Sequence, residues 1–139
     1  MENSRFSSRY CAEIAQTAWQ QICCTTAAPV VMSWGVSHVG AGIVKSDDGN
    51  EMPCLIMHVS GLLHTGLVIV ALDEAMDVYD IQLRDNDGTP TGDWVRGLYF
   101  DEIGEKIDEL VERSPNMTDE GYAYLAIKDS ERKMQSQEK

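Results

Sequence analysis

Long apolar runs are absent from this 139-residue chain. No stretch approaches the roughly 18 consecutive apolar residues that a membrane-spanning helix needs. The first five residues also lack a basic start followed by an apolar block, so no secretory signal is expected. Cysteine is scarce: four are too few for a disulfide scaffold at this length, and Cys23 and Cys24 are adjacent. Together these absences predict a cytoplasmic protein with reduced thiols.

Basic residues are few as well. The chain has 11 Lys and Arg against 23 Asp and Glu, a formal net charge of −12. Most of the imbalance lies between Asp73 and Glu120, where fifteen acids face four bases. Such a surface repels phosphate backbones, so direct nucleic-acid binding is not expected. The acids are interpreted either as a well-solvated face or as a surface that attracts a basic partner protein or mimics nucleic acid.

Three common ligand-binding motifs are absent from the sequence. Gly40-Ala41-Gly42 lacks the third glycine and the strand-to-helix context of a dinucleotide loop, and no Gly-Lys-Ser/Thr phosphate loop is present. An EF-hand placed on Asp85-Asn86-Asp87-Gly88 would take its first and last ligands from Leu83 and Trp94, neither of which can bind calcium. A hairpin turn is the better interpretation of that segment.

The chain does contain a short unbroken apolar run, Leu67–Leu72, rich in β-branched residues and preceded by Gly66. Such a run is typical of a strand buried on both faces. The next segment, Val78–Leu83, alternates between apolar and polar residues, which predicts a half-buried strand with Asp80 and Gln82 on its polar side. The two strands are expected to form an antiparallel hairpin.

Alternation elsewhere predicts further strands, and period-3.6 patterns predict helices. The expected strands are Val30–Val36, Cys54–Val59 and Trp94–Tyr99, with a turn or bulge at Gly40–Gly42 before a short strand at Ile43–Val44. The expected helices are Ser7 or Ser8 to Cys24, Glu102–Arg113 capped by Asp101, and Asp119–Met134 capped by Thr118. The Glu102–Arg113 helix should bury Ile103, Ile107, Leu110 and Val111.

This order predicts an α+β fold: an antiparallel meander sheet of about five strands, with an N-terminal helix and two C-terminal helices packed mainly on one face. Residues 1–134 are expected to form a single domain, followed by a flexible tail at 135–139.

Few residues are candidates for metal binding or nucleophilic catalysis. Cys54 and His58 share a strand face but should lie ~13 Å apart, too far for one metal ion. His58 and His64 flank a turn and could approach each other, but no third ligand is evident. Cys54 with either histidine is the one nucleophile pairing worth naming, and a buried strand cysteine is more often a small hydrophobic residue. The tryptophans are interpreted as core or interface residues. No catalytic, cofactor-binding or metal-binding residue is therefore assigned.

Several segments together resemble one family. They are Trp34-Gly35-Val36-Ser37, Met52-Pro53, Gly66–Leu72, Leu98–Glu102 and Ile107–Glu112. Over residues 32–134 the chain is similar to a group of small, functionally uncharacterised proteins on mobile elements of gut bacteria. The resemblance implies an intracellular bacterial protein and supplies no activity or binding residue.

Three functions follow from these patterns as hypotheses. The leading one is a non-catalytic protein-interaction or adaptor domain. The alternative is an acidic inhibitor or nucleic-acid mimic that binds a basic partner protein, and the third is a small cysteine-dependent enzyme. Because Leu67–Leu72 is apolar on both faces, its second face needs a cover, either a two-fold partner in a homodimer or the Asp119–Met134 helix.

Overall fold

The computed structural model describes residues 6–112. The expected helix at 119–134 with its cap at Thr118, the last predicted residue of the preceding helix, Arg113, and the tail at 135–139 lie outside the described residues. The elements in chain order are α1 (Ser8–Thr25), α2 (Ala28–Ser33), β1 (His38–Lys45), β2 (Glu51–Ser60), β3 (Thr65–Asp73), β4 (Val78–Arg84), β5 (Val95–Leu98) and α3 (Ile103–Val111).

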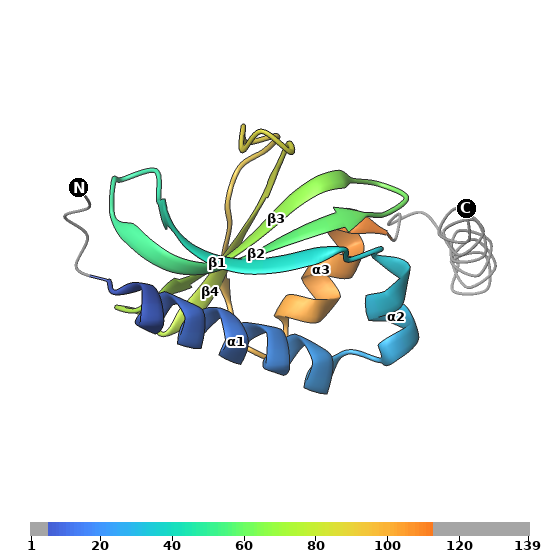
Figure 1. Cartoon of the computed structure of the whole chain (residues 1–139), viewed down its shortest axis with the longest axis horizontal. Coiled ribbons are helices and arrows are strands. Elements are labelled where there is room, and N and C mark those ends of the chain that lie inside the picture. The colour runs from blue at the N-terminus through green and yellow to red at the C-terminus, as the bar shows by residue number, and fades with distance from the viewer. Residues whose placement is uncertain (1–5, 113–139) are drawn as a thin grey trace.

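The strands form one open antiparallel sheet in the order β1-β2-β3-β4-β5. All three helices lie against the same face of this sheet (Figure 1). The predicted α+β meander is therefore confirmed. None of the helices within residues 6–112 is long and apolar enough to cross a membrane.

The main core lies between the helices and the sheet. Helix α1 begins where predicted, because the Ser7 side chain accepts a hydrogen bond from the backbone N–H of Tyr10. Its buried residues recur at helical spacing and pack with those of α3 against the inward side chains of β2, β3 and β4. The cluster includes Ala15, Ala18, Ile22, Trp34, Leu55, Met57, Val59, Val68, Val70, Ile81, Ile103, Ile107 and Val111. Burial of this apolar surface fixes the sheet against its helices.

The predicted strand at Val30–Val36 is wrong. Residues 28–33 form α2, and Pro29 lies in its first turn, where its missing N–H has no helical partner to lose. Gly35, at φ 63°, ends the helix and donates its N–H to the Met32 carbonyl at 3.1 Å. Alternation over seven residues is too short to distinguish a strand from a helix of fewer than two turns.

The predicted turn at Gly40–Gly42 is also wrong, since these residues lie inside the eight-residue strand β1. Gly42 pairs with Cys54, and a Cβ atom at Gly42 would approach the Ile56 Cδ1 atom to 3.0 Å. Glycine here makes room for a large side chain on the neighbouring strand rather than bending the chain.

Strand β3 has the two buried faces that its sequence predicts. Val68 and Val70 join the core beneath the helices, while Ile69 and Ala71 join a second, smaller cluster on the opposite face with Val44, Met52 and Cys54. Because Ile69 and Ala71 are already buried, the central strand offers no open second face to a partner. The homodimer itself stays a prediction.

Two details of the C-terminal half differ from expectation. Helix α3 begins at Ile103, so Glu102 and not Asp101 occupies the N-cap position, and no side chain caps the helix. Glu102 is instead held in a turn, where its backbone N–H donates to the Tyr99 carbonyl and its carboxylate accepts the Tyr99 N–H. Leu110 is only partly buried, unlike Ile107.

Candidate functional site

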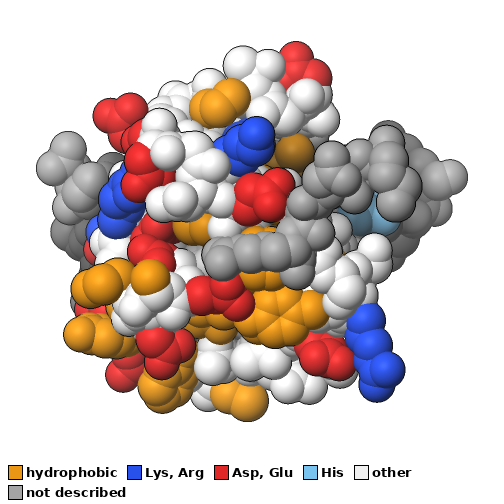
Figure 2. Space-filling view, turned by 90° about the vertical axis from the view of Figure 1, so that its left-hand side faces the viewer, with side chains coloured by type: hydrophobic (Ala, Val, Ile, Leu, Met, Phe, Trp, Pro, Cys, Tyr) orange, Lys and Arg blue, Asp and Glu red, His pale blue; other side chains and the backbone are white. Residues whose placement is uncertain are grey.

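A polar recess lies where the β1–β2 turn, β3, β4 and β5 meet. It encloses about 210 Å³. Five carboxylates and one guanidinium line it, those of Asp48, Glu51, Asp73, Glu74, Asp80 and Arg96. The β1–β2 turn and the start of α1 lie at the end of the molecule drawn on the left of Figure 1. Figure 2 looks at that end, where acidic side chains are spread across the face and basic ones are few.

Asp80 forms the buried wall of the recess. It is 3% exposed, and its Oδ1 accepts the backbone N–H of Gly97 at 3.0 Å. Burial raises the pKa of the Asp80 carboxyl, and the Gly97 N–H opposes that effect by stabilising the anion. The prediction that this side of β4 faces solvent is therefore wrong.

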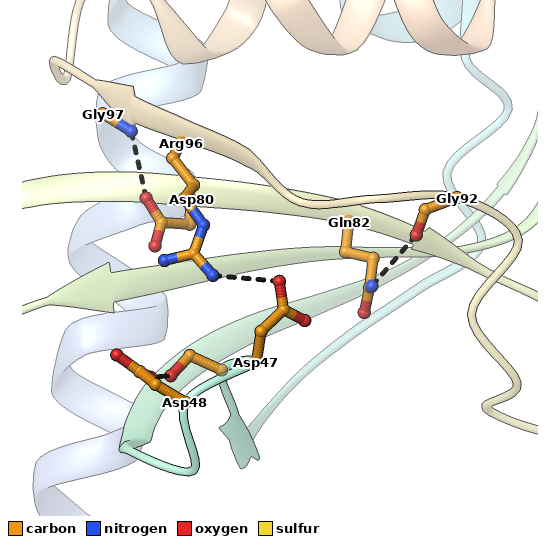
Figure 3. A network of polar contacts seen from close by, with 8 residues as sticks. Asp47, Asp48, Asp80, Gln82, Gly92, Arg96 and Gly97 are labelled. Carbon is orange, nitrogen blue, oxygen red and sulfur yellow. Dashed lines mark hydrogen bonds and ion pairs between the residues drawn. The ribbon is translucent and has the colours of Figure 1, made fainter.

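The neighbouring Gln82 is 6% exposed and donates from its Nε2 to the Gly92 carbonyl at 3.1 Å. As Figure 3 shows, Asp80 and Gln82 both reach the chain that leads into and along β5. Strand β5 pairs with β4 at two positions only, with a register shift between them, and Gly97 has φ 77°. The two side chains thus replace strand pairing that the bulged edge cannot supply.

Arg96 extends from β5 toward the β1–β2 turn, where its guanidinium lies 3.1 Å from the Asp47 carboxylate (Figure 3). The next residue, Asp48, accepts a short hydrogen bond from the Ser46 hydroxyl. That bond, together with backbone N–H groups and the more distant Arg96, lowers the pKa of the Asp48 carboxyl, although slight desolvation opposes it. Asp48 therefore keeps its negative charge at neutral pH.

Charge is the main chemical property of this recess. Its carboxylates outnumber its guanidinium by five to one, and the guanidinium is already paired with Asp47. Opposite charges near a protein surface attract with an energy that salt reduces. The arrangement suits a cationic side chain from another molecule. Within residues 6–112 no group of three or more His, Cys, Asp and Glu side chains is placed to hold a metal ion.

Cys54, the candidate nucleophile named from the sequence, does not line the recess. Cys54 is fully buried in the second cluster, and desolvation raises the pKa of its thiol to about 12. A thiol with that pKa is protonated at neutral pH and is a poor nucleophile.

His58 and His64, the histidines considered as partners of Cys54, make other contacts. His58 has its ring centroid 5.5 Å from that of His38 on β1. The Nε2 atom of His64 lies 3.1 Å from the Leu67 carbonyl oxygen. Neither contact involves the Cys54 thiol.

Two other predictions from the sequence are confirmed. Trp34 is fully buried, and its indole N–H donates to the Asp108 carboxylate at 3.0 Å, which makes it a core residue as predicted. The Asp85–Gly88 segment is the predicted turn: Gly88, at φ 90°, donates its N–H to the Asp85 carbonyl at 2.9 Å. The pairing of Asp47 with Arg96 was missed, because no sequence pattern joins residues so far apart in the chain.

Comparisons of this chain with models of known protein families, with curated proteins and with solved structures gave no match.

Proposed function

We propose that this chain is a non-catalytic protein-interaction or adaptor domain of the cytoplasm, and that its acidic recess binds a basic segment of a partner protein. The observation that carries the proposal is the recess itself, with five carboxylates around a guanidinium that Asp47 already neutralises. A Lys or Arg side chain entering it gains attraction from several carboxylates at once. The buried, protonated thiol of Cys54 supports a non-catalytic role.

A basic peptide tests the proposal directly. A fluorescent hexa-arginine peptide should bind the wild-type protein in an anisotropy titration, with an affinity that falls as NaCl is raised. The variant Asp48→Asn/Glu51→Gln removes two charges at the recess. It should weaken binding about two- to thirtyfold, because each exposed ion pair contributes about 0.2–1 kcal/mol.

A matched control separates a site from general attraction to an acidic protein. Asp93→Asn/Glu105→Gln removes the same charge from exposed positions that do not line the recess. This variant should bind the peptide as the wild type does. Equal weakening by both double variants would show that net charge alone attracts the peptide, and the recess would lose its proposed role.

The alternative function, an acidic inhibitor that mimics nucleic acid, would use the same recess. It is favoured by two pairs of adjacent acids, Asp47-Asp48 in the β1–β2 turn and Asp73-Glu74 at the end of β3. Proteins captured by the wild-type chain but not by Asp48→Asn/Glu51→Gln would then be displaced by duplex DNA. Partners that stay bound when DNA is added would favour the interaction domain over the mimic.

A further inference from the structure

The two edges of the sheet differ in how they are protected. Strand β5 at one edge has four residues, a register shift against β4 and a left-handed Gly97. Short length and bulges are the features that prevent an edge strand from pairing with another chain. Strand β1 at the other edge has eight residues and an unbroken register with β2, and it contains no proline. Within residues 6–112 no strand pairs with its outer side.

The β1 edge also belongs to a nearly neutral part of an otherwise acidic molecule. Residues 1–45, which include α1, α2 and β1, contain two acids and three bases. The remaining residues, 46–139, contain twenty-one acids and eight bases. Two copies of the chain therefore repel each other over most orientations, and approach without repulsion where their β1 edges meet.

An apolar groove runs beside this edge, between α1 and β1. It encloses about 270 Å³ and is lined by Ala12, Gln16, Trp19, Val39, Ala41 and neighbouring residues. Val39 is 48% exposed, and Ala41 is exposed as well. A side chain from an added strand would lie at the mouth of this groove and bury apolar surface there.

From these three observations we infer that the occupant of the β1 edge is a second copy of this chain. The two β1 strands pair antiparallel across a two-fold axis, which joins the two sheets into one of ten strands. A two-fold axis perpendicular to the sheet keeps the helices of both copies on one face and brings each α1 next to its counterpart. This surface is distinct from the acidic recess, and the inference does not depend on the proposed function.

The oligomeric state is the first measurement. Light scattering and sedimentation at about 0.15 M NaCl, from micromolar to submillimolar protein, should show the mass rise from 15.5 kDa toward twice that value. A mass that stays at 15.5 kDa throughout this range would overturn the inference and leave the edge to a strand of some other protein.

A charge introduced near the two-fold axis tests where the two copies meet. Ala41 lies near the middle of β1, so a charge placed there approaches the same charge on the second copy. Ala41→Lys and Ala41→Glu should each weaken self-association by about tenfold or more, since like charges opposite each other destabilise a sheet. An equal mixture of the two variants should restore it. The controls Met76→Lys and Met76→Glu, in the exposed β3–β4 turn outside β1, should dimerise as the wild type does.

A mixture that fails to restore association, or Ala41 variants that dimerise normally, would each overturn the two-fold pairing. Hydrogen exchange of the wild-type protein gives a readout that needs no variant. The backbone amides of β1 should exchange more slowly at high protein concentration than at low, while those of β5 should not change. Concentration-dependent protection confined to any other segment would place the contact elsewhere and refute the proposal.

Discussion

Asp80 carries a carboxyl group that the fold removes from water. Its pKa is raised mainly by burial, and the nearby Asp73 adds to the effect, while the Gly97 N–H and Arg96 oppose it. The unfolded chain titrates near the ordinary value of 3.8, and the folded chain titrates above it. The folded state therefore holds this proton more tightly. The stabilisation is fully present below pH 3.8 and is lost as pH rises through the raised pKa.

Asp80→Asn cannot ionise, so it should not lose this stability as pH rises. We therefore expect its free energy of unfolding, measured in urea melts, to increase relative to that of the wild type as pH rises from about 3.5 toward 7. Asp87→Asn provides a control of opposite sign. The Thr89 N–H and hydroxyl lower the pKa of Asp87, so its contribution is lost as pH falls. A difference for Asp80→Asn that stays constant with pH would show that burial does not perturb this carboxyl.

Individual side chains were predictable where the cause is local. The Ser7 cap depends on residues three positions apart, and the burial of Cys54 follows from its place in an apolar strand. Asp80 and Gln82 were misjudged, because alternation tells which face of a strand a side chain occupies but not whether that face is covered. Residues 92–97 cover Asp80 and Gln82, and no short-range sequence pattern predicts this contact.

The contact between α1 and α3 depends on a glycine. A Cβ atom added to Gly104 would lie 1.8 Å from the Thr26 Oγ1 atom and 3.1 Å from the Thr26 Cβ atom. Rotation of the Thr26 side chain removes the first contact but leaves the second. Replacing glycine by alanine in a helix usually stabilises it by about 1 kcal/mol. Here Gly104→Ala should instead destabilise the protein by about 1–3 kcal/mol, because the two helices must separate.

A double-variant cycle checks this assignment in denaturant melts. Thr26→Ala removes the Oγ1 atom, so Gly104→Ala should cost less in its presence than in the wild type. Gly92→Ala is the matched control, since its added Cβ atom meets nothing within 4 Å. Additive losses from the two variants would mean that Thr26 and Gly104 are not in contact.

At the level of elements, long periodic segments were predictable and short ones were not. The 18 residues of α1 and the apolar run of β3 each carry enough positions to fix a period. The six residues of α2 do not, and their Val-Val-Met sequence favours a strand locally. Tertiary packing favours the helix instead, because Trp34, which follows it, is fully buried and donates a hydrogen bond to Asp108 on α3.

The candidate site is a property of the whole chain and could not be predicted from its parts. Its residues come from the β1–β2 turn, β3, β4 and β5, and the Arg96–Asp47 pair joins positions 49 residues apart. The sequence showed only that acids are abundant after Asp73. It did not show that the meander returns the β3–β4 turn and β5 to the β1–β2 turn, which concentrates carboxylates at one end.

That concentration should make the stability of the protein depend on salt. Residues 46–139 carry nearly all of the negative charge, and five carboxylates share one recess. At about 0.01 M ionic strength their repulsion acts over about 30 Å, and at about 0.1 M over about 10 Å. Raising NaCl over this range should therefore raise the melting temperature. Asp48→Asn/Glu51→Gln should respond less to NaCl than Asp93→Asn/Glu105→Gln, which removes equal charge outside the recess. Thermal melts at constant protein concentration provide the measurement, because self-association also stabilises the fold. A melting temperature that falls with added NaCl would mean that ion pairs such as Arg96–Asp47 outweigh the repulsion at this end of the molecule.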